Sequence, residues 1–210
     1  MTRVFLASRN EKKLAEMRRI LEPFVPEVEV LGLDDVDPYD EPAETEPTFE
    51  GNALLKARAA VHATGLPSLA DDSGLCVDAL NGMPGVLSAR WSGRRKEAGA
   101  VDGPNNELLL AQLRDVPDER RAAQFRSAVG FAYPVGAGGI TEHVVCGVMP
   151  GRIIREMRGS GGFGYDVLFV ADGQERTAAE LPPEEKDAIS HRGMAVREIV
   201  PVVVDVLGGL

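Results

Sequence analysis

An α/β fold is predicted for this 210-residue chain by two observations: strand and helix patterns alternate in its first half, and a long hairpin pattern occupies its second half. Hydrophobic residues make up 44% of the chain, which is enough to bury a sizeable core. The sequence contains no internal repeat and no low-complexity linker. We therefore expect residues 1–210 to form a single domain with two lobes.

The first strand and helix are expected at the N-terminus. The apolar run Arg3–Ala7 predicts a strand, and an amphipathic helix pattern follows the polar turn Ser8–Lys13. Ser8 or Asn10 can cap this helix, whose free N–H groups attract an anion such as a triphosphate. The alternative is a capped helix that binds nothing, because the glycines of a Walker loop are absent.

A second helix is expected from its cap at Thr48 through Ala63. It follows an acidic stretch, 34–47, whose prolines indicate a loop. Asn52 and Lys56 lie four positions apart and therefore share one face of the helix. That face can meet the phosphates of a nucleotide; the alternative is that Lys56 is simply exposed.

The most informative segment is Leu69–Leu75, in which an apolar run meets two adjacent carboxylates and a Ser-Gly pair. If the run is the end of a strand, Asp71 and Asp72 point to opposite sides, so only one of them faces a given cleft. A single acid at a strand end suits Mg²⁺, which takes one or two carboxylates together with water and substrate phosphates. The alternative is a turn in which the carboxylates cap backbone N–H groups.

A glycine-rich segment, 159–166, precedes an expected strand over 167–170. Its four glycines let the backbone approach a ligand closely, and Phe163 and Tyr165 offer aromatic faces for a base. The alternative is a glycine-rich hairpin whose aromatic rings belong to the core.

A polar run, 184–193, covers a predicted helix and its end. Lys186 suits a phosphate, whereas His191 and Arg192 suit the polar edge of a base. The alternative is a solvated helix face whose C-terminal His-Arg pair interacts with the helix dipole.

The second half of the chain predicts a long antiparallel hairpin. Residues 123–133 and 140–149 alternate as its two strands, and 152–156 is expected to add a further strand. 

Two further helices are expected. One follows the polar loop 92–104 and is capped by Asn105 or Asn106. The other, Met194–Leu207, is expected to kink or restart at Pro201, because proline removes a helix hydrogen bond.

Charge and cysteine content argue against several classes of protein. A net charge of −10 and a pI near 4.9 disfavour a nucleic-acid binder, which needs a basic face to neutralise phosphates. There is no signal-peptide pattern and no apolar run of membrane-spanning length, so a cytoplasmic protein is expected. Cys76 and Cys146 lie in apolar stretches and are expected to be buried thiols, and no cysteine-histidine spacing typical of zinc occurs.

Five motifs, taken in order, make the chain resemble the inosine/xanthosine triphosphate pyrophosphatases. This family acts on noncanonical purine nucleoside triphosphates, and its members are also called Ham1-like or RdgB-like proteins. The likeness runs from the first strand to the last helix. The motifs are Ser8-x-Asn10-x-x-Lys13, Thr48-Phe49-Glu50-Gly51-Asn52-Ala53 with Lys56-Ala57, Ala70-Asp71-Asp72-Ser73-Gly74-Leu75, Gly161-Gly162-Phe163-Gly164-Tyr165-Asp166 and Ser190-His191-Arg192-Gly193.

The resemblance implies a Mg²⁺-dependent enzyme, usually a homodimer, that hydrolyses dITP, ITP, XTP or dXTP to the monophosphate and pyrophosphate. It also implies an elongated two-lobed fold, with a long central mixed sheet flanked by helices and a substrate cleft between the lobes. Asp72 would be the catalytic acid and a metal ligand, and Glu44 is the nearest candidate for a second ligand. The implied substrate-binding residues are Ser8, Arg9, Asn10, Glu11, Lys12, Lys13, Ser73, Phe163, Gly164, Tyr165, Asp166, Lys186, His191 and Arg192.

The chain departs from the family's pattern beside the expected metal site. Many relatives carry a glutamate directly before the asparagine that corresponds to Asn52, whereas Gly51 stands there in this chain and Glu50 comes one position earlier. One helical position is a rotation of about 100° around the axis, so Glu50 does not simply inherit the role of that glutamate.

Two other functions fit the same residues. A noncatalytic nucleotide-binding module would bind nucleotide without releasing pyrophosphate. A Maf-like pyrophosphatase would act on pyrimidine or modified nucleotides. The His191-Arg192 pair favours a purine pyrophosphatase over the Maf-like enzyme, because its donors match the 6-oxo acceptor of hypoxanthine or xanthine. The displaced Glu50 leaves the noncatalytic module open.

Overall fold

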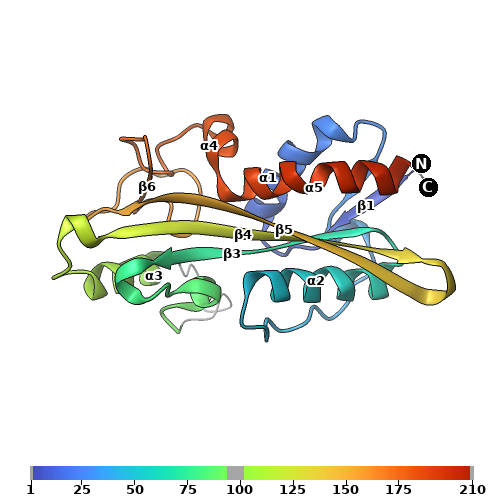
Figure 1. The fold of residues 1–210 in the computed structure, drawn as a ribbon, viewed down its shortest axis with the longest axis horizontal. Helices are drawn as coiled ribbons and strands as arrows, with labels where there is room; N and C mark the ends of the chain where they lie inside the picture. Colours follow the sequence, from blue (N-terminus) through green and yellow to red (C-terminus); the bar gives the residue numbers. More distant parts are fainter. Residues whose placement is uncertain (1, 94–101, 209–210) are drawn as a thin grey trace. The chain divides into compact units, whose positions relative to one another are not determined.

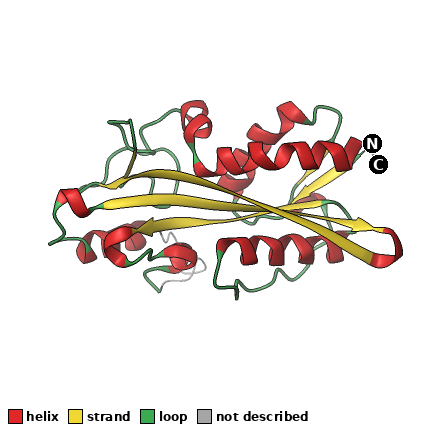
Figure 2. Ribbon diagram, in the orientation of Figure 1, coloured by secondary structure: helices red, strands yellow, loops and turns green. Residues whose placement is uncertain are grey.

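The computed structural model describes residues 2–93 and 102–208 and has an α/β fold (Figures 1 and 2). The strands are β1 (Arg3–Leu6), β2 (Glu29–Leu31), β3 (Ser68–Val77), β4 (Ala122–Val135), β5 (Gly139–Ile153) and β6 (Phe169–Ala171). The helices are α1 (Glu11–Leu21), α2 (Phe49–Thr64), α3 (Asp102–Gln112), α4 (Pro183–Ile189) and α5 (His191–Gly208).

The six strands form one mixed sheet in the order β2-β1-β3-β4-β5-β6. Strand β1 pairs in parallel with both β2 and β3, whereas β6 pairs with β5 in the antiparallel sense. The expected mixed sheet with flanking helices is therefore confirmed.

The contacts divide the chain into two compact units, which we describe separately. Unit 1 contains residues 1–72, 127–147 and 191–210, and unit 2 contains residues 73–126 and 148–190. The long strands β3, β4 and β5 contribute residues to both units. That residues 1–210 act as one domain stays a prediction.

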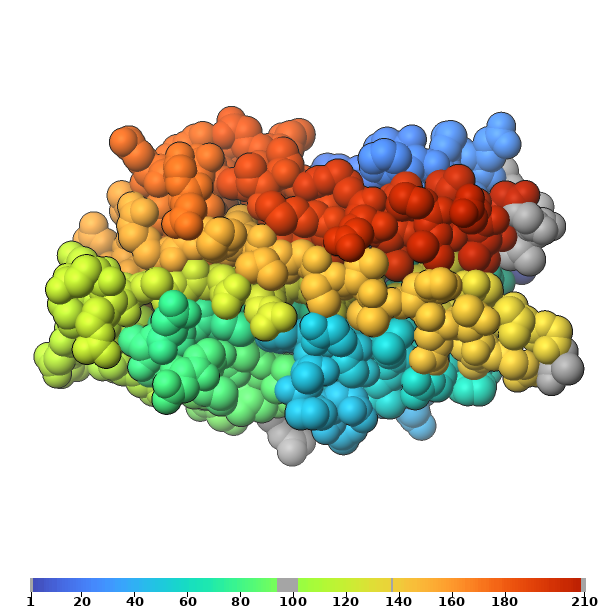
Figure 3. All heavy atoms as spheres, viewed as in Figure 1, coloured from blue at the N-terminus to red at the C-terminus, as the bar shows by residue number. Residues whose placement is uncertain are grey.

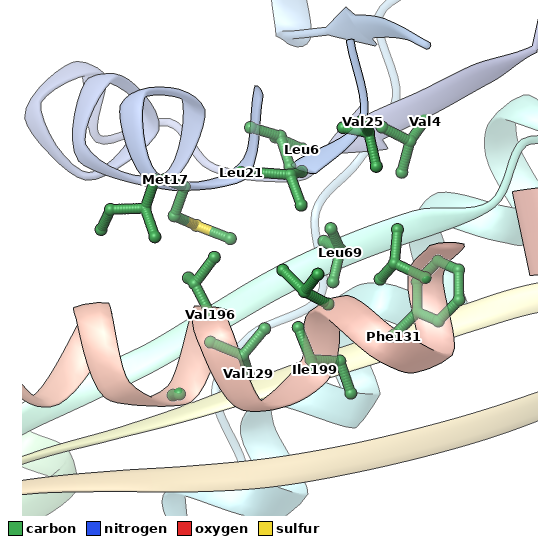
Figure 4. Packing of buried hydrophobic residues seen from close by; sticks show 14 of the residues in the cluster. Val4, Leu6, Met17, Leu21, Val25, Leu69, Val129, Phe131, Val196 and Ile199 are labelled. Atoms are coloured by element: carbon green, nitrogen blue, oxygen red, sulfur yellow. The ribbon is translucent and has the colours of Figure 1, made fainter. Parts of the chain in front are cut away.

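Unit 1 buries apolar side chains on both faces of its strands. Val4 and Leu6 of β1 belong to a core cluster that includes residues of α1 and α5, whereas Phe5 belongs to a second cluster with residues of α2. Figure 4 shows the first cluster, and Figure 3 shows α5 (red) beside the N-terminal segment (blue) on the surface of this unit. Because side chains alternate along a strand, the sheet of unit 1 is covered on one face by α1 and α5 and on the other by α2.

Several elements follow the sequence pattern closely. Helix α1 is capped by Asn10, which is one of the two expected caps, and α2 begins directly after Thr48, whose hydroxyl accepts from the Gly51 N–H at 3.0 Å. The expected hairpin is confirmed as β4 and β5, although β5 extends beyond its expected end to Ile153.

Four expected boundaries are wrong. The Asp71-Asp72 pair lies in the middle of β3, neither at a strand end nor in a turn. Helix α3 begins at Asp102, so Asn105 and Asn106 are buried inside it instead of capping it. The part of the expected loop at 94–101 lies outside the described residues.

The two other corrections concern the end of the chain. No separate strand forms over 152–156, because Arg152 and Ile153 complete β5 where it pairs with β6. Helix α5 begins at His191, so the His-Arg pair opens a helix instead of ending one, and it runs without restart through Pro201. Pro201 is exposed, and the apolar face of α5 is held in the core by packing, which outweighs the lost hydrogen bond.

The cysteines are both free, as expected, but only Cys76 is buried; Cys146 is exposed. Across residues 2–93 and 102–208, none of the helices is long and apolar enough to cross a bilayer.

Candidate functional site

The pairing of β1 with β3 places the first turn of α1 beside the aspartate pair. Leu6 pairs with Leu69, and the N–H of Ala7 donates to the carbonyl of Leu69 at 2.8 Å. β1 ends there, whereas β3 continues through Asp71 and Asp72. In parallel sheets, ligands bind at the carboxyl ends of strands, where the following helices begin.

Asp71 points toward the face that α1 and α5 cover. It accepts from Lys13 Nζ at 2.6 Å, from Ser127 Oγ at 2.5 Å and from Arg192 Nη2 at 3.3 Å, and Arg192 also pairs with Glu16. Burial alone would raise the pKa of this carboxyl group, but Arg192 and Lys13 outweigh burial and hold the pKa of Asp71 well below its usual range. Burial lowers the pKa of Lys13.

Asp72 points toward the opposite face, which α2 covers. Its Oδ2 accepts from Asn52 Nδ2 at 3.2 Å and its Oδ1 accepts from Lys56 Nζ at 2.8 Å. Burial raises the pKa of Asp72 to about 6, against the opposing effect of Lys56. The two aspartates therefore face opposite sides, as the sequence alternation predicts, and only Asp72 has the raised pKa of a group that can accept a proton near neutral pH.

Asn52 and Lys56 share one face of α2, as their spacing predicts, and both reach Asp72. Asn52 also fixes the segment before the helix, because its side chain bonds the N–H of Glu46 at 3.0 Å and the carbonyl of Glu46 at 3.3 Å. Gly130 on β4 lets the helix approach closely, since a Cβ there would lie 2.9 Å from the backbone of Ala53.

Lys56 joins Asp72 to Glu44. Its Nζ lies 2.6 Å from Glu44 Oε1 as well as 2.8 Å from Asp72 Oδ1. Burial opposes the charged form of Lys56, but Asp72 and Glu44 outweigh it and raise its pKa. One ammonium group therefore occupies the position where a cation contacts both carboxylates.

Glu50 contacts a residue of β5. Its Oε1 accepts from the thiol of Cys146 on β5, at 3.1 Å. No side chain can replace it from position 51, because a Cβ at Gly51 would lie 2.7 Å from Cβ of Glu46. Glu44 is thus the carboxylate that the structure brings to Asp72.

The remaining residues of the first motif surround the start of α1. Asn10 Oδ1 accepts from the N–H groups of Lys12 and Lys13, and Ser8 Oγ accepts from the N–H of Asn10. Arg9 is exposed and pairs with Glu41 at 3.3 Å; Glu11 and Lys12 are also exposed.

Unit 2 contains the glycine-rich loop. Tyr165 is buried in the core of this unit, and its hydroxyl donates to the carbonyl of Ser88 at 2.9 Å. Phe163 is half-buried. Of the two aromatic rings, Phe163 is therefore the one that retains accessible surface for a base.

Lys186 is buried against the same loop. Its Nζ lies 2.6 Å from Asp166 Oδ2 and 5.0 Å from the ring centroid of Phe163. Asp166 also accepts from the Phe163 N–H at 2.9 Å, so the carboxylate closes the turn. A Cβ at Gly162 would lie 2.1 Å from this carboxylate, and Gly162 has a φ of +64° that favours glycine.

Some of these partners were absent from the predicted site. Ser127, Glu16 and Lys56 complete the surroundings of the two aspartates. Of the three, only Lys56 was indicated by the sequence, through its spacing of four positions from Asn52. Ser73 is half-buried directly after Asp72. His191 is buried at the first position of α5, where its carbonyl would contact any Cβ at Gly147.

Comparisons with known proteins show which family the chain matches. The model of the Ham1 family matches residues 4–202. A dITP/XTP pyrophosphatase from Nocardia farcinica is 61% identical over 204 residues, covering 97% of this chain and 95% of that protein. One from Mycobacterium tuberculosis (strain H37Rv) is 56% identical, covering 97% and 96%.

Solved structures show the same likeness. The crystal structure of a nucleoside-triphosphatase / dITP/XTP pyrophosphatase from Mycobacterium abscessus has a TM-score of 0.73 and 55% identity, covering 95% of this chain and 100% of that one. A HAM1 protein from Coxiella burnetii has a TM-score of 0.82 and 40% identity, covering 98% and 100%.

Proposed function

This chain belongs to the Ham1 family, and from that premise we propose that it is a dITP/XTP pyrophosphatase. It hydrolyses noncanonical purine nucleoside triphosphates, including dITP, ITP and XTP, to the monophosphate and pyrophosphate, and so removes them from the nucleotide pool. Two named relatives of at least 56% identity carry this activity in their names, and the match extends over nearly the whole chain.

The observation that carries the proposal is the environment of Asp72. The carboxylate is buried, has a pKa raised to about 6, and is oriented by Asn52 and Lys56. A carboxylate with these properties is suited to orient a water molecule and to accept its proton. Asp71, one position earlier, is committed to Lys13 and Arg192 instead.

The donor set of the site fits Mg²⁺, which the resemblance implies. Asp72 and Glu44 both form ion pairs with one cation, Lys56 Nζ. Carboxylate oxygens are the protein ligands that Mg²⁺ prefers. In the described part of the chain, no three His, Cys, Asp or Glu side chains are grouped to hold a metal. Two carboxylates suffice, since Mg²⁺ fills its other positions with water and substrate phosphates. When bound, the ion would supply Lewis-acid stabilisation of the phosphate charge.

The proposed reaction is attack of water on the α-phosphorus, with pyrophosphate as the leaving group. Asp72 accepts the proton of the water. Lys13, which would share its ammonium group between Asp71 and the substrate, and the N–H groups at the start of α1 stabilise charge on the phosphates. The other residues of that turn, Ser8 to Lys12, line the phosphate site. No covalent nucleophile is required, because a positioned water suffices.

Base recognition is proposed for two sets of residues. Phe163 stacks on the purine, with Gly164, Tyr165, Asp166 and Lys186 forming its support. His191 and Arg192 remain proposed as donors to the 6-oxo group, which adenine lacks. Arg192 would have to share its donors with Asp71 and Glu16, its partners in this structure.

Four further expectations stay predictions: the homodimer, the cytoplasmic location, the elongated two-lobed shape and its substrate cleft. Sedimentation equilibrium tests the first of them directly.

A substrate panel tests the proposed function. Pyrophosphate and orthophosphate release would be measured with dITP, ITP, XTP, ATP, GTP and dTTP, each with Mg²⁺ and with a chelator. We expect pyrophosphate from dITP, ITP and XTP only, and only with Mg²⁺. Tight binding of dITP without any release would identify a noncatalytic module, and a preference for dTTP would identify a Maf-like specificity; either result contradicts the proposal.

A further inference from the structure

The first turn of α3 binds both polar backbone atoms of Gly164 in the glycine-rich loop of unit 2. The N–H of Gly164 donates to Asp102 Oδ2 at 2.8 Å, and the carbonyl of Gly164 accepts from Asn106 Nδ2 at 2.8 Å. Asn106 is only 2% exposed and also donates to the carbonyl of Asp102 at 2.8 Å. These two side chains, one helical turn apart, form what we call the Gly164 clamp.

The amide of Asn106 has only one orientation that fits. Its Nδ2 meets two carbonyl oxygens, so exchanging its nitrogen and oxygen would place acceptor against acceptor at both. Its Oδ1 is buried and has no hydrogen-bond partner among the described residues. The contribution of Asn106 to the loop is therefore made by its two donor bonds.

The clamp fixes the backbone directly after Phe163. The N–H that donates to Asp102 belongs to the peptide joining Phe163 to Gly164. The carbonyl that accepts from Asn106 belongs to the next peptide. Gly164 has a φ of +63°, which glycine adopts without strain. An added Cβ would meet nothing within 4 Å, so the glycine is required by its backbone conformation and not by lack of space.

Two other side-chain contacts of the loop lie on either side of Gly164. Asp166 holds the N–H of Phe163 on one side of Gly164, and Ser88 holds the hydroxyl of Tyr165 on the other. The carbonyl of Phe163 accepts from the N–H of Asp166 at 3.3 Å, and Lys186 Nζ lies 5.0 Å from the Phe163 ring. At Gly164 itself, Asp102 and Asn106 supply the hydrogen bonds seen here to the N–H and the carbonyl, so they fix the two peptides that follow the Phe163 ring.

We propose that Asp102 and Asn106 are positioning residues for recognition of the purine base, acting through Gly164 on Phe163. This inference rests on the proposed function, in which Phe163 contacts the base. The base lies away from the reacting phosphorus, so its contacts are the same in the ground state and the transition state. Loss of the clamp should therefore raise KM and leave kcat nearly unchanged.

The variants are chosen to separate the hydrogen bonds from the size of the side chain. Asp102→Ala removes the acceptor, whereas Asp102→Asn keeps an oxygen that can accept from Gly164. Asn106→Leu keeps the approximate size and removes both donors. Asp118→Ala is the matched control in the same unit, because Asp118 is exposed and pairs only with Arg155 among the contacts of its side chain seen here.

Binding is measured by calorimetry with two probes, dIMP, which carries the base, and pyrophosphate, which lacks it. For Asp102→Ala and Asn106→Leu we expect dIMP affinity to fall about tenfold, a loss typical of one hydrogen bond to a polar or charged partner, with pyrophosphate affinity unchanged. KM for dITP should rise in parallel. Asp102→Asn and Asp118→Ala should stay within about twofold of wild type.

Two results would overturn the inference. One is unchanged dIMP affinity in Asp102→Ala and Asn106→Leu. The other is an equal loss of dIMP and pyrophosphate affinity, which would show a general structural defect. Wild-type turnover of dITP tests the proposed function separately, since the calorimetric comparison needs no turnover.

Discussion

Asp71 and Asp72 are adjacent in β3, yet their carboxylates bind side chains from opposite faces of the sheet. Asp71 contacts Lys13 of α1 and Arg192 of α5, whereas Asp72 contacts Asn52 and Lys56 of α2. The same fold thus gives one carboxyl group a depressed pKa and its neighbour a raised one. Two titratable groups whose environments separate their pKa values in this way have different roles.

Asp71→Asn should lower the stability of the metal-free protein. The change leaves the buried Arg192 and the partly buried Lys13 without their shared carboxylate, which costs about 3 kcal/mol of unfolding free energy at pH 7. Because the folded-state pKa of Asp71 lies well below 3.8, this stabilisation is present above about pH 4 and is lost as the pH falls further. Urea unfolding with EDTA at several pH values between 7 and 3 measures it.

The control for this change is Asp118→Asn, which removes an exposed carboxylate and should alter stability by less than about 1 kcal/mol. Equal stability of Asp71→Asn and wild type at pH 7 would show that Asp71 does not compensate the charges of Lys13 and Arg192.

Glu44→Gln should weaken the response to Mg²⁺. Glu44 shares Lys56 with Asp72, so its carboxylate is close enough to share a metal ion, whereas Glu50 contacts Cys146 instead. The Mg²⁺ concentration for half-maximal pyrophosphate release should rise at least about tenfold in Glu44→Gln. The matched variant Glu50→Gln has the same change in charge and should stay near wild type. The reverse order of these two variants would assign the second ligand to Glu50.

Arg121→Met should destabilise unit 2. The guanidinium of Arg121 is 2% exposed and donates to the carbonyls of Leu113, Ile153 and Ile154 at 2.6 to 3.1 Å. Removing it takes a charged donor from all three carbonyls, of which Leu113 keeps the N–H of Val116, at a cost of about 3 kcal/mol. Thermal unfolding measures this against Arg155→Met, an exposed arginine, which should lose less than about 1 kcal/mol. A similar loss in both variants would contradict the account of Arg121.

The parts of the fold that the sequence predicts are those set by local pattern. Helix α2 follows from its cap at Thr48, the β4–β5 hairpin follows from alternation, and the opposite directions of Asp71 and Asp72 follow from the geometry of a strand. Asn52 and Lys56 reach one carboxylate because four positions make one helical turn.

The parts that the sequence does not predict depend on partners distant in the chain. The sequence predicts that the Asp71-Asp72 pair lies at the end of a strand. Two buried charges inside a strand are stable only with the cations that the fold supplies, and these cations cannot be located from the sequence. Arg192 comes to Asp71 from the last helix, 121 positions away. The sequence does not indicate that α3 begins at Asp102, because Asp-Gly-Pro is typical of a turn.

The central claim is that Asp72 is the acid that drives pyrophosphate release, and its most direct test is Asp72→Asn with dITP and Mg²⁺. Pyrophosphate release and the thermal unfolding midpoint in EDTA would be measured on the same preparation. Because burial raises the pKa of Asp72 to about 6, the ionised carboxylate costs stability above that pH, so the variant at pH 8 should unfold no earlier than wild type. We predict a folded variant whose pyrophosphate release falls at least about a thousandfold. A folded variant that retains wild-type turnover would contradict the account.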